Sequence, residues 1–179
     1  MNKQFFSRIV GAVIFSLAFI APAYAAEPVQ LEWFDLVPKD WKPEKEFEAL
    51  NIPGMADITD DDPRAAELLK KMQAIWEKAP VVKSLAGKQV SIPGYVVPLE
   101  NDGQKVTEFL LVPYHGACIH TPPPPANQTI YVKTGKADAK IRKMFDTVTV
   151  TGTMQLERID RDLATSGYTI DASSVVPFE

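Results

Sequence analysis

The sequence contains few of the residues and motifs that point directly to a chemistry. It has one cysteine, Cys118, so no disulfide can form within the chain, and it has only two histidines. No phosphate-binding glycine loop, Gly-x-Ser-x-Gly elbow, Cys-x-x-Cys pair or Cys-x-x-Cys-His haem-attachment motif occurs. These absences argue against nucleotide-binding, serine-hydrolase, dithiol and c-type haem functions.

Basic residues are in the minority. The chain has 19 Lys and Arg against 23 Asp and Glu, which gives a net charge of −4 at pH 7. Two of the basic residues, Lys3 and Arg8, lie in an N-terminal segment that we expect to be removed, and their loss would bring the net charge to −6. Phosphate backbones repel an acidic protein, so we expect no nucleic-acid partner.

Long apolar runs are missing, apart from a short one near the start. A positively charged beginning is followed by the apolar run Ile9–Ile20 and by a small-x-small pattern at residues 23–25. This arrangement predicts a secretory signal over residues 1–25, with the mature chain beginning at Ala26. The run is shorter than the roughly 20 residues of a membrane-spanning helix. We therefore expect a periplasmic protein with no stable membrane anchor after signal cleavage.

The remaining chain is long enough for one domain with its own core. Residues 26–62 are rich in proline and charge and are expected to form an N-terminal segment and linker, while residues 63–179 form a single α+β domain. Within the first segment, the aromatic-rich stretch Leu31–Pro38 predicts a short edge strand or turn that packs Trp33 and Leu36 on the core.

The aromatics of the N-terminal segment have a second interpretation. Trp33, Phe34 and Trp41 could instead form a surface for a partner.

Residues 63–79 are predicted to form an amphipathic helix. Asp62 is placed to cap it, Pro63 suits its first turn and Pro80 ends it. Its apolar positions recur at three- and four-residue spacing and are expected in the core. They are Ala65, Leu68, Leu69, Met72, Ile75, Trp76 and Ala79.

The rest of the chain is mostly strand-like. Five stretches combine β-branched residues with turn signals at their ends, and the first is interrupted by Pro93-Gly94, which predicts a bend or bulge. They are residues 88–99, 106–114, 129–135, 147–157 and 167–175. We expect an α+β, mostly β protein: a small five-stranded antiparallel barrel of the oligonucleotide/oligosaccharide-binding (OB) type, or a related roll, with one N-terminal amphipathic helix.

All the soft metal donors other than methionine lie within six consecutive residues. His115, Cys118 and His120 form a His-x-x-Cys-x-His pattern, which predicts three ligands for a transition metal. Cys118 and His120 would point to the same side if the backbone is extended, and Gly116 gives the turn freedom to fold His115 back over them.

A proline tract follows the donors. Pro122, Pro123, Pro124 and Pro125 predict a stiff extended segment that braces the donor loop or binds a partner. Asn127 and Gln128 come next, and their amides are candidates to orient a ligand imidazole from behind.

Three stretches together resemble a known family. Val96–Glu100, Phe109–Gln128 and Val148–Gly152 are similar to domain-of-unknown-function family 3299 of exported bacterial proteins, and the resemblance runs from about Leu31 to Val176. It implies a periplasmic or membrane-tethered protein, often encoded near a lipoprotein-exporter-like transporter and, in some bacteria, among zinc-responsive genes. Unlike lipoprotein members, this chain has no cysteine near the cleavage site to carry a lipid.

Three functions remain open. The first is a periplasmic zinc-handling accessory or chaperone, with copper as the alternative metal and a membrane transporter or another periplasmic metal protein as partner. The second is a non-catalytic structural or interaction module that uses the proline-rich loop. The third is an enzyme with Cys118 as nucleophile, which lacks any recognisable orienting acid. The clustered donors favour the first, so we expect no catalytic residues.

Overall fold

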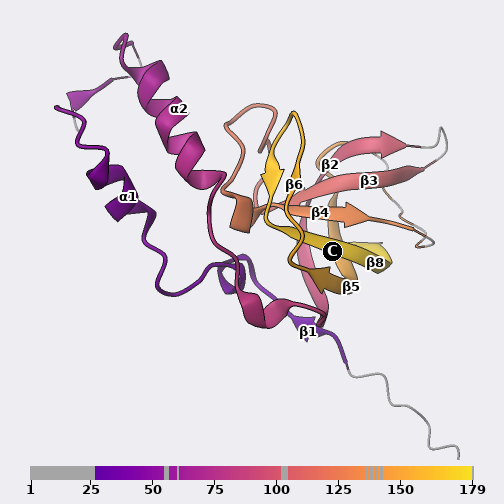
Figure 1. The fold of residues 1–179 in the computed structure, drawn as a ribbon. Helices are drawn as coiled ribbons and strands as arrows, with labels where there is room; N and C mark the ends of the chain where they lie inside the picture. Colours follow the sequence, from indigo (N-terminus) through magenta and orange to yellow (C-terminus); the bar gives the residue numbers. More distant parts are fainter. Residues whose placement is uncertain are drawn as a thin grey trace, which may run out of the picture.

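A closed five-stranded barrel forms the centre of the molecule (Figure 1). The computed structural model describes residues 27–54, 57–59, 61–101, 105–135, 137, 139, 141 and 143–178 of the 179. Going round the barrel, the strands are β2 (Gln89–Asn101), β3 (Val106–Val112), β4 (Ile130–Lys133), β8 (Tyr168–Pro177) and β5 (Thr147–Gln155), which returns to β2. The predicted small OB-like barrel is confirmed.

One strand pair within the barrel departs from the antiparallel arrangement. β4 and β8 run parallel, whereas β2–β3, β3–β4, β5–β8 and β2–β5 are all antiparallel. A closed ring of five strands cannot alternate in direction all the way round, so one neighbouring pair must be parallel, and it is the pair where the last strand fills the gap between β4 and β5. The sequence-based prediction of an entirely antiparallel barrel did not include this parallel pair.

β2 closes the barrel by pairing with two strands along its length. Residues 89–95 pair with β5, and residues 95–101 pair with β3. The pairing with β5 is continuous through the predicted interruption at Pro93-Gly94, and the register shifts of β2 lie farther on, between Pro98 and Asn101. A Cβ atom on Gly94 would lie 2.8 Å from both Leu111 and Trp33. Glycine therefore allows the N-terminal segment to approach β2 closely.

Both faces of β3 are buried, which divides the apolar residues into two clusters. Phe109 and Leu111 point into the barrel, while Leu110 and Val112 lie on its outer face. The outer cluster also contains Val97, Ala117, Tyr131 and Ala164. It is covered by the loop after β3 and by the hairpin of β6 (Ile159–Asp160) and β7 (Thr165–Ser166).

The N-terminal segment docks on the barrel as predicted. β1 (Val29–Gln30) pairs parallel to the start of β2, and the 3-10 helix η1 (Trp33–Leu36) follows. Leu36 is fully buried, and the indole nitrogen of Trp33 donates a hydrogen bond of 2.8 Å to the Pro93 carbonyl oxygen. The predicted edge strand or turn that packs these two residues is confirmed, whereas Phe34 is 68% exposed.

One buried hydroxyl joins this segment to the rest of the protein. The hydroxyl of Tyr168, in β8, donates to the Leu36 carbonyl oxygen at 2.7 Å and accepts from the backbone N–H of Val82 at 2.7 Å. Val82 comes just before the 3-10 helix η3 (Lys83–Leu85), which leads into β2. A single side chain therefore holds three distant segments together.

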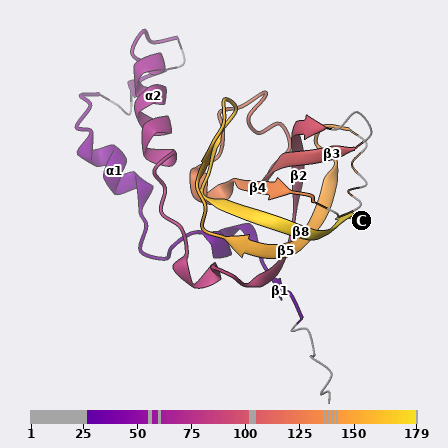
Figure 2. The same cartoon turned by 45° about the vertical axis from the view of Figure 1, so that its right-hand side comes forward.

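Two helices form an arm that stands beside the barrel (Figures 1 and 2). The predicted helix over residues 63–79 is α2 (Ala65–Trp76), and the carboxylate of Asp62 accepts a hydrogen bond of 2.8 Å from the Arg64 backbone. α1 (Pro43–Ala49) was not predicted, because it lies in the stretch expected to be a linker. The rings of Phe47 and Trp76 meet edge to face at 6.2 Å.

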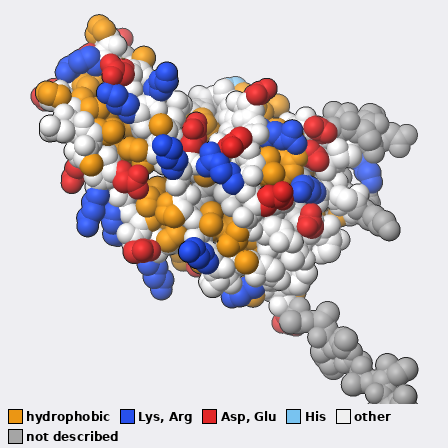
Figure 3. Space-filling model, viewed as in Figure 1, with side chains coloured by type: hydrophobic (Ala, Val, Ile, Leu, Met, Phe, Trp, Pro, Cys, Tyr) orange, Lys and Arg blue, Asp and Glu red, His pale blue; other side chains and the backbone are white. Residues whose placement is uncertain are grey.

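The apolar face of α2 does not enter the barrel core. Neither α1 nor α2 has a buried residue, so the prediction that this face belongs to the core is wrong for the helix itself. The 3.6-residue periodicity reveals an apolar face but not the surface it meets, and here α1 covers it only in part. Figure 3 shows hydrophobic side chains exposed on the arm among charged ones.

The next two points concern the predicted signal and membrane-spanning helices. The predicted signal over residues 1–25 lies outside them. Within the part of the chain that the structure describes, no helix is long and apolar enough to cross a membrane.

Replacing Tyr168 with phenylalanine is expected to lower the free energy of unfolding by about 2 kcal/mol, because it leaves a buried carbonyl and a backbone N–H without a partner. Urea unfolding followed by circular dichroism measures this. Tyr114→Phe is the matched control, since Tyr114 is 43% exposed, and it should change stability by less than about 0.5 kcal/mol. Equal losses in the two variants would contradict the role assigned to the Tyr168 hydroxyl.

Candidate functional site

The predicted donors lie on a tight turn at the end of β3. The backbone N–H of His120 donates to the Gly116 carbonyl oxygen at 2.9 Å, and Ala117 pairs with Thr121 across the turn. Gly116 has a φ of 87°, which confirms the predicted use of its backbone freedom. Cys118 also has a positive φ, 68°, which is unusual for a residue with a side chain.

This turn overturns the expectation of an extended backbone from Cys118 to His120. Because Cys118 is in the left-handed region, its side chain and that of His120 do not share one side as they would on a strand. Cys118 is half-buried and packs against the outer apolar cluster, whereas His120 is exposed. Sequence alone gives little signal for such a conformation at a cysteine.

Both histidines meet the same aromatic ring. The ring centroids of His115 and Phe145 are 4.6 Å apart, and those of His120 and Phe145 are 6.2 Å apart. Tyr95 contacts His115 from another side, edge to face, at 6.0 Å. Both imidazoles are exposed, so the turn displays two nitrogen donors side by side on the surface.

The thiol of Cys118 is held in its neutral form. Burial raises its pKa to about 11, because the thiolate would lose solvation beside apolar side chains. No described disulfide partner exists, since Cys118 is the only cysteine of the chain. The protein in this state therefore presents a protonated, weakly nucleophilic thiol at neutral pH.

The three donors do not form a preassembled site. Across the described ranges, no three His, Cys, Asp or Glu side chains come close enough together to hold one metal ion. The turn brings the two imidazoles to Phe145 and directs the thiol toward the outer cluster. A shared metal would therefore need the exposed imidazoles to turn away from Phe145.

The two amides after the prolines have other hydrogen-bond partners. They belong to the 3-10 helix η4 (Ala126–Gln128). The amide nitrogen of Asn127 donates to the Pro80 carbonyl at 3.0 Å, and that of Gln128 donates to the Trp33 carbonyl at 2.6 Å. These contacts fix the N-terminal segment and the end of the arm, and none of them orients a histidine.

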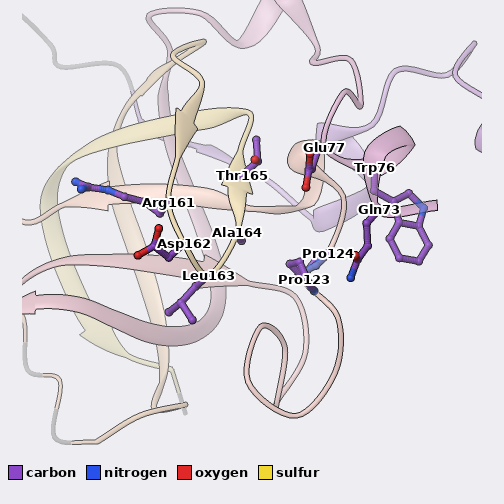
Figure 4. Close-up of a pocket in the computed structure, with 10 residues that line it drawn as sticks. All are labelled: Gln73, Trp76, Glu77, Pro123, Pro124, Arg161, Asp162, Leu163, Ala164 and Thr165. Carbon is purple, nitrogen blue, oxygen red and sulfur yellow. The ribbon is translucent and has the colours of Figure 1, made fainter. Parts of the chain in front are cut away.

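The proline tract forms one wall of a cleft. Pro123 and Pro124 face the end of α2, and the tip of the β6–β7 hairpin closes the other side (Figure 4). The cavity has a volume of about 240 Å³. Its remaining lining residues are Gln73, Trp76, Glu77, Arg161, Asp162, Leu163, Ala164 and Thr165. The prolines predicted to bind a partner thus border a real concavity.

The sequence over residues 33–177 matches the family described as "Protein of unknown function (DUF3299)". The chain belongs to this family. The crystal structure of a DUF3299 family protein from Pseudomonas aeruginosa PAO1 is 37% identical, with a TM-score of 0.63, and the match covers 85% of this chain and 97% of that one. The resemblance read from the sequence is thereby confirmed.

Two further comparisons with this DUF3299 chain add no information on its function. The OBody AM2EP06 bound to hen egg-white lysozyme matches at 17% identity and a TM-score of 0.33, covering 54% of this chain and 84% of that chain, and a likeness of this size does not bear on fold or function. No curated protein sequence matches the chain significantly.

Sequence reasoning missed the residues that surround the donor turn and part of the lining of the cleft in this DUF3299 chain. Phe145 and Tyr95 surround His115, yet they are distant from it in sequence and carry no metal-binding signal. Trp76 was assigned to the core by its helical spacing, although it lines the cleft. Its position near the end of an amphipathic helix gave no indication of which neighbour it would meet.

Labelling of Cys118 by iodoacetamide should be slow at pH 7 in metal-free protein and rise about tenfold per pH unit toward pH 10, because a pKa near 11 leaves little thiolate. Mass spectrometry of chelator-treated protein measures the rate. In urea the rise should level off near the ordinary thiol pKa of about 8.5. A plateau by pH 9 in the folded protein would contradict the burial argument.

Proposed function

We propose that this protein is a periplasmic transition-metal-binding protein, a zinc-handling accessory or chaperone that works with a transporter or another periplasmic metal protein. Its ligands would be His115, Cys118 and His120, and copper is the alternative metal. The observation that supports this most is the convergence of both imidazoles on Phe145, on a surface turn that also carries the only cysteine.

The exposure of the imidazoles suits a protein that acquires and releases metal. Exposed side chains can rotate without moving the barrel, and Gly116 already gives the turn the backbone it needs. Three protein ligands would leave a fourth zinc position open to a donor from a partner. The half-buried thiol is the ligand whose position the fold restricts most, because Cys118 packs on the outer cluster.

The raised pKa of Cys118 separates this proposal from a thiol enzyme. An enzyme of that kind needs its thiolate formed before substrate arrives, whereas a bound Zn²⁺ can itself stabilise the thiolate against the cost of burial. Cys118 does not line the cleft beside the proline tract. The enzyme is therefore the least supported of the three functions.

Isothermal titration of the metal-free mature chain with ZnCl₂ should give about one Zn²⁺ per chain. His115→Ala and His120→Ala should each weaken binding at least about tenfold, and Cys118→Ser more, because each change removes a ligand. Tyr114→Phe is the control, since it lies in the same turn and removes no nitrogen or sulfur donor. Wild-type affinity in the triple variant His115→Ala, Cys118→Ser, His120→Ala would show that this turn is not the site.

A second function, a non-catalytic interaction module, is favoured by one observation. Pro123 and Pro124 face the cleft beside α2, where a partner could reach them. The proline tract is extended at its end, since Pro125 has φ −53° and ψ 151°. In this function the tract docks a partner and does not brace the donor turn.

Replacing Pro123 and Pro124 with alanine separates these two roles of the tract. If the prolines serve the cleft, the zinc affinity measured by the same titration should stay within about twofold of wild type, because both prolines line the cleft and neither is a ligand. A loss above about tenfold would mean that the tract braces the metal-binding turn instead.

A further inference from the structure

The hairpin of β6 and β7 lies on the outside of the barrel and is a sheet of its own. Its two strands pair only with each other, and the Arg161 N–H donates to the Ala164 carbonyl oxygen at 3.1 Å near the tip. Within the described ranges, no backbone hydrogen bond joins residues 158–166 to a barrel strand. Apart from its two ends, the hairpin is therefore held in place by side chains.

The inner side of the hairpin is apolar. Ala164 is buried, and Ile159 and Leu163 are half-buried, in the outer cluster. The same cluster contains Leu110 of β3 and Tyr131 of β4. Burial of apolar surface has no direction of its own, so it favours a closed hairpin without fixing where the tip lies.

A single arginine fixes the tip. The guanidinium of Arg161 donates to the Tyr131 hydroxyl at 2.6 Å and to Glu108 at 3.2 Å, and it lies over the Tyr131 ring, 5.2 Å from the ring centroid. The Tyr131 hydroxyl in turn donates to Glu108. Figure 4 shows Arg161 extending away from Pro123 and Pro124. Among the described residues, no other side-chain hydrogen bond joins residues 159–166 to the barrel strands.

The base of the hairpin is tied to the arm instead. The guanidinium of Arg158 donates to the carbonyl oxygen of Glu77, the residue that follows α2, and pairs with Asp160 at 2.8 Å. The Thr165 hydroxyl donates to the same carboxylate at 2.8 Å. The hairpin thus bonds the arm at its base and the barrel at its tip.

The outer cluster also supports the donor turn. Ala117 is buried and Cys118 is half-buried in it. The φ of 68° at Cys118 is a conformation that a residue with a side chain keeps only where the surrounding structure holds it. The hairpin and the donor turn are therefore two covers of one apolar surface. Because packed interiors transmit shifts between neighbours, loosening one cover weakens the support of the other.

We propose that the β6–β7 hairpin is a lid, latched shut by Arg161, and that its opening loosens the donor turn. In the closed state Arg161 bonds Glu108 and Tyr131, and in the open state these bonds are broken while Arg158 keeps the base on the arm. One charged contact and a few apolar side chains resist the opening, so it does not require the barrel to unfold. Movement of the arm acts on the same lid through Arg158.

The coupling between the hairpin and the donor turn does not depend on a metal. That the lid regulates metal binding at this turn rests on the proposed function, whereas the coupling itself does not. The test therefore uses metal-free protein with a chelator present. A failed zinc titration and a failed lid are then separate results.

Hydrogen exchange of single backbone N–H groups, followed by NMR on the ¹⁵N-labelled mature chain, measures the opening. The reporters are the N–H at position 161 for the hairpin, the His120 N–H for the donor turn, and the Val150 N–H for the barrel, where β5 is paired on both sides. Arg161→Gln should speed exchange at the first two about tenfold, because it removes a charged hydrogen-bond donor. Exchange at Val150 should stay within about twofold of wild type.

Matched variants separate the latch from general effects. Glu108→Gln should speed the same two reporters, and its combination with Arg161→Gln should add less than about twofold, because both changes break one latch. Arg64→Gln is the control for lost charge, since Arg64 pairs with Asp62 at 2.7 Å in the arm, and it should change neither reporter. Tyr168→Phe is the control for lost stability and should speed exchange at Val150 as well.

Three results would overturn the inference. Unchanged exchange at position 161 in Arg161→Gln would show that this arginine is not a latch. Faster exchange at position 161 with an unchanged His120 N–H would show that the hairpin and the donor turn are not coupled. Equal acceleration of all three reporters, as in Tyr168→Phe, would show that the variant destabilises the whole protein and opens no lid.

Discussion

The hydroxyl of Tyr168 is the contact on which the placement of the other parts depends. It is buried, it has one donor and one acceptor role to fill, and both partners are backbone groups from outside the strands. Gln128 and Asn127 strengthen the same junction by bonding Trp33 and Pro80. This junction fixes where the chain leaves and rejoins the barrel, next to the arm.

The His-x-x-Cys-x-His stretch of this chain has a structural role besides any chemistry. Its turn covers the outer face of β3, and Ala117 and Cys118 are part of that cover. The two histidines do not help to cover the outer face of β3, since both are exposed and lie near Phe145. The motif thus combines an apolar side that stabilises the barrel wall with a polar side available for function.

The sequence predicted what depends on local pattern and missed what depends on distant neighbours. The alternation in β5 could be predicted because a strand's faces repeat every two residues. The parallel pairing of β8 and the meeting of Phe145 with both histidines could not, because each is set by residues far along the chain. The turn itself was found, but its internal geometry was not.

The way the helical arm is attached has a consequence for how the fold can vary. Leu36, before the arm, and Val82, after it, are both bonded to the same hydroxyl, so the chain leaves and returns at one point of the barrel. Everything between them is an inserted cassette in the architectural sense. Relatives could lengthen, shorten or exchange it without disturbing the strands, and with it they would change one wall of the cleft while keeping the proline wall.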